Sequence, residues 1–147
     1  MLSQRARYAL RALIYMNGRG EPVSTAEIAR EVPVPRKFLE QILLQLKAHR
    51  MVESRRGREG GYRLGRSGAE ISFADVIRVV DGPLALAPCA SRTAYRPCES
   101  CSDVETCPIR PALIKARDAT AAILERTTLE DGDSKSFVQT SLTNPIV

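Results

Sequence analysis

The front of the chain carries apolar residues at helical spacing, interrupted by glycine and proline. Over residues 2–17 they recur three and four positions apart, which predicts a helix that ends before Gly18. The apolar positions of that helix are Ala6, Ala9, Leu10, Leu13 and Ile14. Ser24 and Glu27 then form a capping-box pattern, in which each side chain can accept a hydrogen bond from the other residue's backbone N–H. This pattern predicts a second, short helix through about Glu31.

A third helix is predicted directly after the break at Pro33-Val34-Pro35. Proline suits the first helical position, because its missing N–H would have no partner there. The apolar stripe of this helix consists of Phe38, Leu39, Ile42, Leu43 and Leu46, and its other side carries Arg36, Lys37, Glu40, Gln41 and Gln45. Two helices joined by a short turn, the second with a polar and basic face, are typical of a helix-turn-helix. An ordinary helical hairpin with a solvated face gives the same pattern, so both interpretations stay open from these residues alone.

The segment after the third helix predicts a β-hairpin. Residues 51–54 and 62–64 can pair as short strands around RRGREGG at 55–61. The three glycines of this loop permit a tight or left-handed backbone, and three arginines crowd its tip. A glycine-rich loop can also hold a nucleotide phosphate, but this one lacks the Lys-Ser/Thr ending and no helix start follows it directly. An arginine-tipped hairpin after a helix-turn-helix is better explained as a wing that contacts DNA phosphates or the minor groove.

The rest of the chain predicts two more helices around a cysteine-rich stretch. Ser72 begins a helix whose apolar positions, from Phe73 to Val80, cover a core, and Gly82 ends it. A long helix is predicted from about 108 to 129, with an apolar seam that suits either a partner chain or its own domain. The expected fold class is mainly α with a small β-wing: a winged helix-turn-helix domain plus a long dimerisation helix. The expected parts are a winged domain over 1–82, a cysteine-rich loop over 83–108, a dimerisation helix over 109–130 and a flexible tail over 131–147.

Charge is distributed unevenly along the chain. Residues 1–66 contain 14 Lys and Arg against 6 Asp and Glu, whereas residues 67–147 contain 8 against 11. Such an asymmetry suggests that the front half meets a polyanion such as nucleic acid. A basic surface that is simply solvated has the same composition, so charge alone does not decide between the two.

The sequence also bears on compartment. No apolar run approaches the roughly 18 residues of a membrane span. The basic and partly apolar start resembles a signal peptide, but Arg7 and Arg11 interrupt it and no small-residue cleavage site follows. We therefore expect a cytoplasmic protein with no membrane partner, in which thiols stay reduced.

All four cysteines fall within nineteen residues, at Cys89, Cys98, Cys101 and Cys107. The spacing C-x8-C-x2-C-x5-C contains one C-x2-C pair, whereas a structural zinc site prefers two. Thiolates also hold iron–sulfur clusters, in several irregular spacings. Catalysis by one thiol is not expected, because the only histidine, His49, lies next to the wing and no base lies beside the cysteines. Iron–sulfur, zinc and redox thiols all stay open from the spacing.

Six stretches, in this order, resemble the bacterial winged-helix regulators that include IscR, NsrR and RirA. They are RYALRAL (7–13), STAEIAREV (24–32), FLEQIL (38–43), SRRGREGGYRL (54–64), DVIRVVDG (75–82) and the cysteine stretch. The resemblance covers about residues 1–129, and RGxxGGY and D-V-I-x-x-V-D-G are its most specific parts. It implies a homodimeric transcription factor, not an enzyme, that senses iron, cluster, redox or nitric oxide status through an iron–sulfur cluster. We expect it to act as a repressor. Some relatives lack the cysteines and respond to other signals, so the cluster prediction depends on the cysteine stretch itself. The alternative is a winged-helix DNA-binding protein with a structural zinc site or a thiol-redox switch.

The resemblance also implies a ligand set. Members commonly use three cysteines, and the matching positions are Cys89, Cys101 and Cys107. Cys98 is extra. Some relatives add a histidine three residues after the last cysteine, where this chain has Arg110, and others add an aspartate in the first helix, where it has Arg7 or its neighbour. With both of these ligands missing, Cys98 is the expected fourth ligand. Four thiolates fit either a 2Fe–2S or a 4Fe–4S cluster.

The same resemblance implies how DNA is contacted. Polar residues near the start of the recognition helix enter the major groove, where glutamate can accept from cytosine and glutamine can pair with adenine. A wing arginine, which corresponds to Arg56, enters the minor groove. The expected DNA-binding residues are Arg36, Lys37, Glu40, Gln41, Arg55, Arg56 and Arg58. Two subunits, paired through the 108–129 helix, would each read one half-site of a near-palindromic double-stranded operator, with centres about 34 Å apart.

Overall fold

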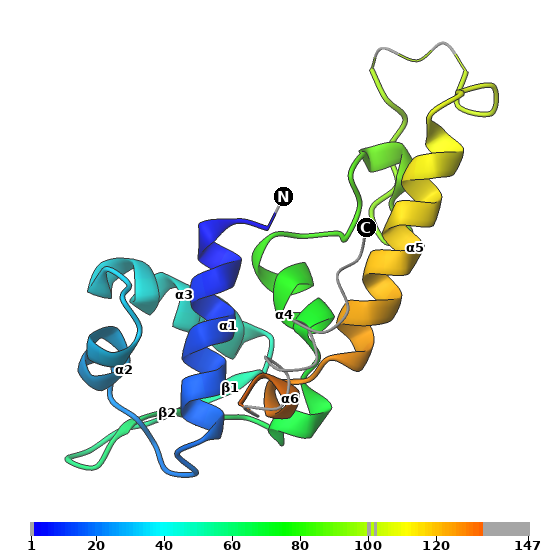
Figure 1. The fold of residues 1–147 in the computed structure, drawn as a ribbon. Coiled ribbons are helices and arrows are strands. Elements are labelled where there is room, and N and C mark those ends of the chain that lie inside the picture. The colour runs from blue at the N-terminus through cyan, green and yellow to red at the C-terminus, as the bar shows by residue number, and fades with distance from the viewer. Residues whose placement is uncertain (1, 100, 102, 134–147) are drawn as a thin grey trace.

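The structure is a computed structural model, and it describes residues 2–99, 101 and 103–133. That part of the chain forms six α-helices and one two-stranded antiparallel sheet (Figure 1). The helices are α1 (Gln4–Asn17), α2 (Thr25–Glu31), α3 (Arg36–Ala48), α4 (Phe73–Val80), α5 (Arg110–Arg126) and α6 (Leu129–Asp133). The strands are β1 (Val52–Arg55) and β2 (Gly61–Leu64), and short 3₁₀ turns occupy η1 (Gly68–Glu70) and η2 (Pro88–Ala90). The mainly helical fold with one small sheet confirms the predicted fold class.

Serine side chains begin two of the helices that frame the core. Ser3 Oγ accepts a hydrogen bond from the backbone N–H of Ala6 at 3.0 Å, which starts α1. Before α4 the predicted capping box is complete: Asp75 N donates to Ser72 Oγ at 3.1 Å and Ser72 N donates to Asp75 Oδ2 at 3.3 Å. Each cap satisfies backbone N–H groups that would otherwise have no partner in the first turn.

The capping box predicted for α2 forms only in part. Ser24 Oγ accepts from Glu27 N at 3.1 Å, as expected. The Glu27 carboxylate does not close the box; it accepts from the Tyr15 hydroxyl at 2.9 Å and pairs with Arg19 at 3.3 Å. Glu27 therefore joins α2 to α1, a tertiary contact that competes with the local one.

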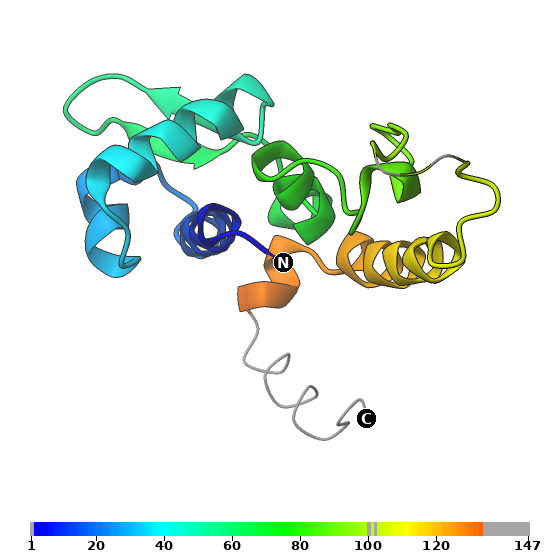
Figure 2. The same cartoon turned by 90° about the horizontal axis from the view of Figure 1, so that it is seen from above.

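The hydrophobic core lies around α1, with α3, α4 and α6 packed against it (Figure 2). Its largest fully buried side chains are Leu13, Ile28, Leu39, Ile42, Leu43, Leu46, Val52, Ile71, Val76 and Leu129. Four of the five residues predicted for the apolar stripe of α3 are fully buried, and Phe38 is half-buried. Burying one such side chain contributes roughly 1.5–3 kcal/mol, so this stripe fixes which face of α3 remains outside.

The predicted hairpin is present, and both strands extend one residue further toward the loop than expected. Val52 pairs with Leu64 at the base of the hairpin. The strand β2 is also joined to the segment before α2, because Val23 and Tyr62 exchange two backbone hydrogen bonds of 2.8 Å. Val52 is buried while residues 53–55 are exposed, so the hairpin is anchored at its base and open to solvent at its tip.

The long helix predicted from about 108 to 129 is two helices in the structure. α5 ends at Arg126, because the following residues pair with the segment before α4: Phe73 N donates to the Thr127 carbonyl at 2.8 Å. Leu129 N likewise donates to a carbonyl of that segment, and its side chain is fully buried. α6 therefore packs on α1 as part of the core, which the helical pattern alone did not predict.

The remaining predictions about this end of the chain have separate outcomes. Residues 131–133 belong to α6, and the rest of the predicted tail, 134–147, lies outside the described residues. Over the ranges that the structure describes, we find no helix long and apolar enough to cross a membrane.

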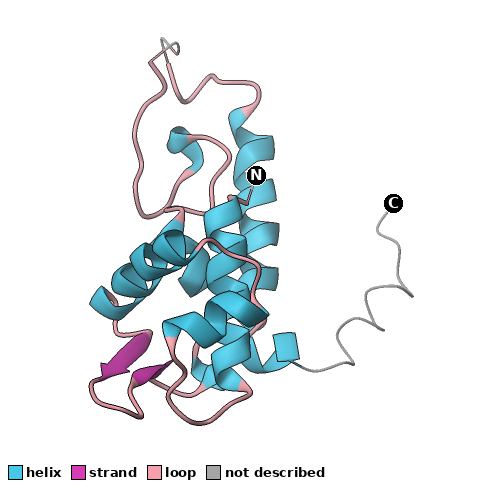
Figure 3. Ribbon diagram, turned by 90° about the vertical axis from the view of Figure 1, so that its left-hand side faces the viewer, coloured by secondary structure: helices cyan, strands magenta, loops and turns pink. Residues whose placement is uncertain are grey.

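α5 lies at the edge of the molecule beside α4 (Figures 1 and 2). None of its residues is buried, in contrast to the other long helices. The hairpin and the loop that carries the cysteines lie at opposite ends of the molecule (Figures 1 and 3). The fold thus separates two candidate functional regions and places α4 between them.

Candidate nucleic-acid interface and cysteine site

α3 presents a polar face on the side away from the core. Arg36, Lys37, Glu40 and Gln41 are all exposed on it, and Leu44, 61% exposed, is an apolar member of this face that sequence reasoning missed. Arg36 Nε pairs with Glu40 Oε1 at 3.3 Å, one helical turn apart. An exposed pair of this kind contributes only about 0.3–0.5 kcal/mol, so both side chains are available to a ligand. The structure brings the four predicted helix residues together on one surface.

The hairpin tip carries the exposed arginines Arg55, Arg56 and Arg58. Gly57 lies between them with φ +115°, a conformation that L side chains rarely adopt, so the turn depends on glycine. At Gly61 a Cβ would collide with the backbone of Val23, so the close approach of β2 to that segment also requires glycine. Three guanidinium groups within four residues make the tip strongly basic, as a surface that contacts phosphates requires.

Two contacts that the sequence pattern did not predict hold α3 against its neighbours, one to β1 and one to α1. Lys47 Nζ donates to Ser54 Oγ at 2.5 Å, which joins the end of α3 to β1. At the other end of α3, the Arg5 guanidinium lies 5.9 Å from the centre of the Phe38 ring, and the Tyr8 ring packs edge-on against the Phe38 ring. The signal for the second contact was an aromatic residue at the edge of the apolar stripe, beside a basic first helix.

Gln45 was expected on the polar side of α3, and that prediction was wrong. Its Nε2 donates to the carbonyl of Val79 in α4 at 2.6 Å, and the residue is half-buried. Gln45 lies three positions after Ile42 and therefore at the edge of the apolar stripe. Its polar character led the sequence interpretation to the wrong face, although its position pointed to the right one.

The turn that carries Cys89 is fastened to α5 by two arginines. Arg110 Nε donates to the Cys89 carbonyl at 3.2 Å, and the Arg117 guanidinium donates to the Ala90 carbonyl. Arg117 also pairs with Asp118 at 2.8 Å, and its side chain is only 12% exposed. Cys89 is buried as a result, and the start of the cysteine loop has a fixed position on α5.

The four cysteines are free thiols, and they are close enough to influence one another. An interaction with the Cys98 thiol, reinforced by burial and by Cys107, raises the pKa of Cys89. Burial, together with the same two neighbours, raises the pKa of Cys101. Backbone N–H groups at the start of α5 lower the pKa of Cys107, because they stabilise its thiolate. Cys98 and Cys107 thus influence both of the other thiols, so the structure brings all four into one neighbourhood.

The thiols are gathered but not arranged around one point. Within residues 2–99, 101 and 103–133, no three side chains of His, Cys, Asp or Glu are placed to hold a metal ion. Cys89 is fixed by the arginine contacts and Cys107 precedes α5, whereas Cys98 and Cys101 lie on the loop between them. As soft sulfur donors they suit zinc, copper(I) or the iron of an iron–sulfur cluster.

A helix-turn-helix with an exposed polar recognition face, followed by an arginine-tipped hairpin, defines a winged-helix DNA-binding protein. A family model described as "Rrf2: Iron-dependent Transcriptional regulator" matches residues 2–131. The chain belongs to the Rrf2 family of transcriptional regulators. The resemblance to IscR-like regulators that the sequence motifs indicated is thereby confirmed.

Individual relatives agree with this assignment. An HTH-type transcriptional regulator of Rhodobacter capsulatus, named as rrf2-like, is 37% identical over 136 residues, which cover 89% of this chain and 91% of the relative. The solved structure of CymR (YrzC), the global cysteine regulator of B. subtilis, has a TM-score of 0.73 and 30% identity over 90% of this chain and 95% of that one. IscR of T. potens has a TM-score of 0.67 and 25% identity, covering 90% and 85%. These relatives are regulators, in agreement with the prediction that the chain is not an enzyme.

Proposed function

We propose that this regulator binds an iron–sulfur cluster through Cys89, Cys98, Cys101 and Cys107, and that the state of this site controls its DNA binding. The observation that carries the proposal is the gathering of four free thiols on a loop fastened to α5. Family membership does not choose the signal, since the family description names iron while CymR is described as a global cysteine regulator. The thiols of this chain favour the cluster.

The donor set fits such a group. Thiolates are the usual ligands of iron–sulfur clusters, and backbone N–H groups already favour the thiolate of Cys107. Arg110 stands where some relatives have a ligating histidine, and its guanidinium is bonded to the Cys89 carbonyl. Cys98, which interacts with the Cys89 thiol, is therefore the available fourth donor. A bound cluster would supply a centre that iron supply, oxidants or nitric oxide can alter.

The loop gives this site a way to influence the rest of the protein. Four thiolates can meet only if the loop between Cys89 and Cys107 closes. The loop begins at η2, which packs on α5, and it ends at α5, which packs on α4. Closed and open loops would then hold α4 and α5 differently. A coupling free energy of about 1–3 kcal/mol between the two sites would change DNA affinity by roughly 5- to 150-fold. We expect the DNA-bound form to act as a repressor.

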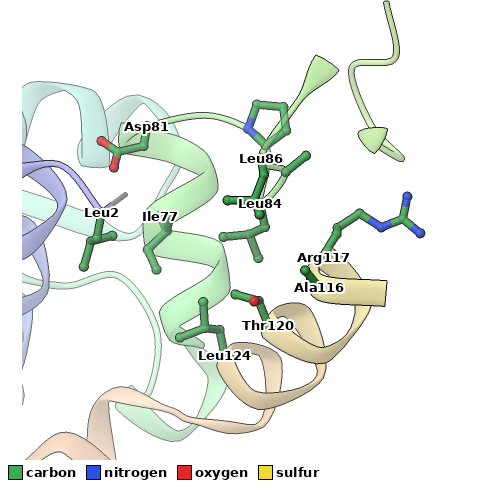
Figure 4. A pocket seen from close by; sticks show the side chains of 11 residues that line it. Leu2, Ile77, Asp81, Leu84, Leu86, Ala116, Arg117, Thr120 and Leu124 are labelled. Atoms are coloured by element: carbon green, nitrogen blue, oxygen red, sulfur yellow. The ribbon is translucent and has the colours of Figure 1, made fainter. Parts of the chain in front are cut away.

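A second copy of the chain is the partner that we propose for α5. Ile109 and Ile123 are 63% and 56% exposed, and a partly apolar hollow of about 340 Å³ lies between α5, α4 and the segment that leads to the cysteines (Figure 4). Leu84, Leu86 and Leu124 are among the side chains that line it. Two helix-turn-helix units must be joined to read two half-sites of a near-palindromic operator. Sedimentation should give a dimer that Ile123→Glu dissociates; a wild-type monomer would exclude this arrangement.

On DNA we assign the exposed face of α3 to the major groove and the hairpin tip to the minor groove and phosphates. The residues proposed to make these contacts are Arg36, Lys37, Glu40, Gln41, Arg55, Arg56 and Arg58. Their common exposure, on elements that the core and the Lys47–Ser54 bond hold together, supports this assignment.

Anaerobic purification tests the cluster. We expect coloured protein with visible absorption and matching amounts of iron and acid-labile sulfide, because four thiolates hold either cluster type. Colourless protein with stoichiometric zinc would replace the proposal with a structural zinc site, and metal-free protein with reversible thiol oxidation would replace it with a redox switch. Cys98→Ser should weaken or change the cluster. Cys101→Ser is the comparison, because it removes a ligand that the three-cysteine pattern also includes. A spectrum indifferent to Cys98→Ser would make this residue a bystander.

A further inference from the structure

The last turn of α4 joins other helices at the point where the chain leaves for the cysteine loop. The Asp81 carboxylate accepts from the backbone N–H of Ser3 at 2.9 Å and from the Ser3 hydroxyl, which ties the turn to the start of α1. Arg78 pairs with Glu125 of α5. Gly82 follows with φ +93°, and the chain turns there toward the cysteines. A displacement of the loop's entrance therefore acts first on this turn.

Gln45 links the same turn to the recognition helix. Its Nε2 donates to the carbonyl of Val79 at 2.6 Å, between residues 34 positions apart in the sequence. Carbonyls in the last turn of a helix have no intrahelical partner, so the Val79 oxygen is free to accept this bond. The opposite orientation of the amide would place two oxygen atoms against each other, so the geometry requires the donor orientation.

The other half of the Gln45 amide carries a cost in stability. Its Oε1 is buried and has no hydrogen-bond partner in the part of the chain that the structure describes. A buried acceptor without a donor is destabilising, and an apolar side chain of similar volume would fill the same edge of the core without that cost. Such a side chain could not supply the directional bond to Val79.

We propose that Gln45 is a positioning residue for DNA recognition, through which the last turn of α4 sets the orientation of α3. Gln45 lies one helical turn after Gln41, so a shift of its anchor moves the exposed face that carries Glu40 and Gln41. The connection from α4 to α3 is the Gln45–Val79 hydrogen bond itself. Only the idea that the cysteine loop acts through this bond rests on the function proposed above.

Hydrogen exchange of the metal-free protein tests the link independently of any cluster. Glu125→Gln weakens the hold of α5 on Arg78 and should raise amide exchange in the second half of α3 by at least about fivefold. In a Gln45→Met background the same change should leave α3 unaffected. Gln4→Met is the matched control, and in that background α3 should respond as in the wild type. The Gln4 amide also donates a hydrogen bond, to the Tyr8 hydroxyl at 2.6 Å, but it does so on the surface of α1. An equal response with and without Gln45, or no response in the wild type, overturns the proposal.

DNA binding tests whether the cysteine loop uses the link. The probe is a duplex that the wild-type protein selects from a random-sequence pool, and the two states compared are the anaerobic protein and its Cys98→Ser/Cys101→Ser variant. Their affinities should differ about 5- to 150-fold in the wild type and by no more than about twofold in Gln45→Met. The unfolding midpoint of Gln45→Met should stay close to that of the wild type, because removal of the buried Oε1 offsets the loss of the bond to Val79.

The outcomes of this second experiment separate the two proposals. A full affinity difference in Gln45→Met would show that the loop acts without Gln45 and would refute its positioning role. Equal affinities of both states in the wild type would remove the proposed function of the loop, and the exchange experiment alone would then decide whether Gln45 positions α3. A drop in the unfolding midpoint of Gln45→Met together with an unchanged affinity difference would identify a purely structural residue.

Discussion

The winged domain and the cysteine loop are stabilised in different ways: the domain by a buried apolar core, the loop mainly by hydrogen bonds. The domain buries a continuous apolar core around α1, and its helices α1, α2 and α4 begin at serine caps. The loop from 83 to 109 is held by short-range contacts, such as Ala94 N to Ser91 Oγ, and by the arginines that fasten its first turn to α5. Packing keeps the exposed residues of α3 and of the hairpin in fixed positions. The middle of the cysteine loop can rearrange because little apolar surface restrains it.

The largest expected effect tests the difference in packing directly. Leu43→Ala removes a fully buried side chain from α3 and should lower the free energy of unfolding by about 2–5 kcal/mol. Tyr95→Ala, which removes a half-exposed side chain from the loop, should change it by no more than about 0.5 kcal/mol. Chemical denaturation of both variants measures these values. A comparable loss from Tyr95→Ala would show that the loop contributes to the core.

The fixed end of the loop should behave differently from the rest of it. Arg117→Ala removes a nearly buried charged donor from the Ala90 carbonyl. The free energy of local opening of the Cys89 turn, measured by hydrogen exchange, should fall by about 1.5–3 kcal/mol. Arg92→Ala is the matched control, since Arg92 also pairs with Asp118, at 2.9 Å, but its side chain is 71% exposed. If Arg92→Ala opens the turn as much, the fastening depends on the Asp118 pair and not on the carbonyl contact.

The smallest of the three effects concerns the wing. Arg56→Ala should weaken binding to the selected duplex by about 1–3 kcal/mol, because it removes a cationic contact at the hairpin tip. Lys115→Ala, which removes an exposed cation from α5, should leave affinity nearly unchanged and provides the control. Fluorescence anisotropy at physiological salt measures both. Equal losses would mean that overall charge, not the wing, attracts the DNA.

Local patterns were sufficient to predict most of the winged domain. The stripe of α3, the Ser72–Asp75 box and the hairpin all depend on neighbouring residues, and all are present. The errors arose where a distant partner competes with a local one. Glu27 bonds to Tyr15 instead of closing its own cap, and α5 stops because the residues after it pair with the segment before α4. Helical spacing contains no information about either partner.

The candidate sites divide in the same way. Exposure of the polar face of α3 followed from helical periodicity, and exposure of the hairpin arginines followed from their place in a glycine-rich loop between two strands. The sequence spacing of the cysteines indicated a common site, but which thiol acts on which depends on how the loop folds back on α5. The role of Arg110 is a clear example, since its contact with the Cys89 carbonyl joins residues 21 positions apart.

The hairpin and the loop that carries the cysteines lie at opposite ends of the molecule, and this placement has an evolutionary consequence (Figure 3). In the described residues, the exposed side chains of α3 and of the hairpin tip make no hydrogen bond or ion pair with the cysteine loop. Under the function proposed above, mutations in that loop would therefore change the stimulus while the same promoters stay recognised. A lineage could thus keep its set of target genes while the stimulus that controls them changes.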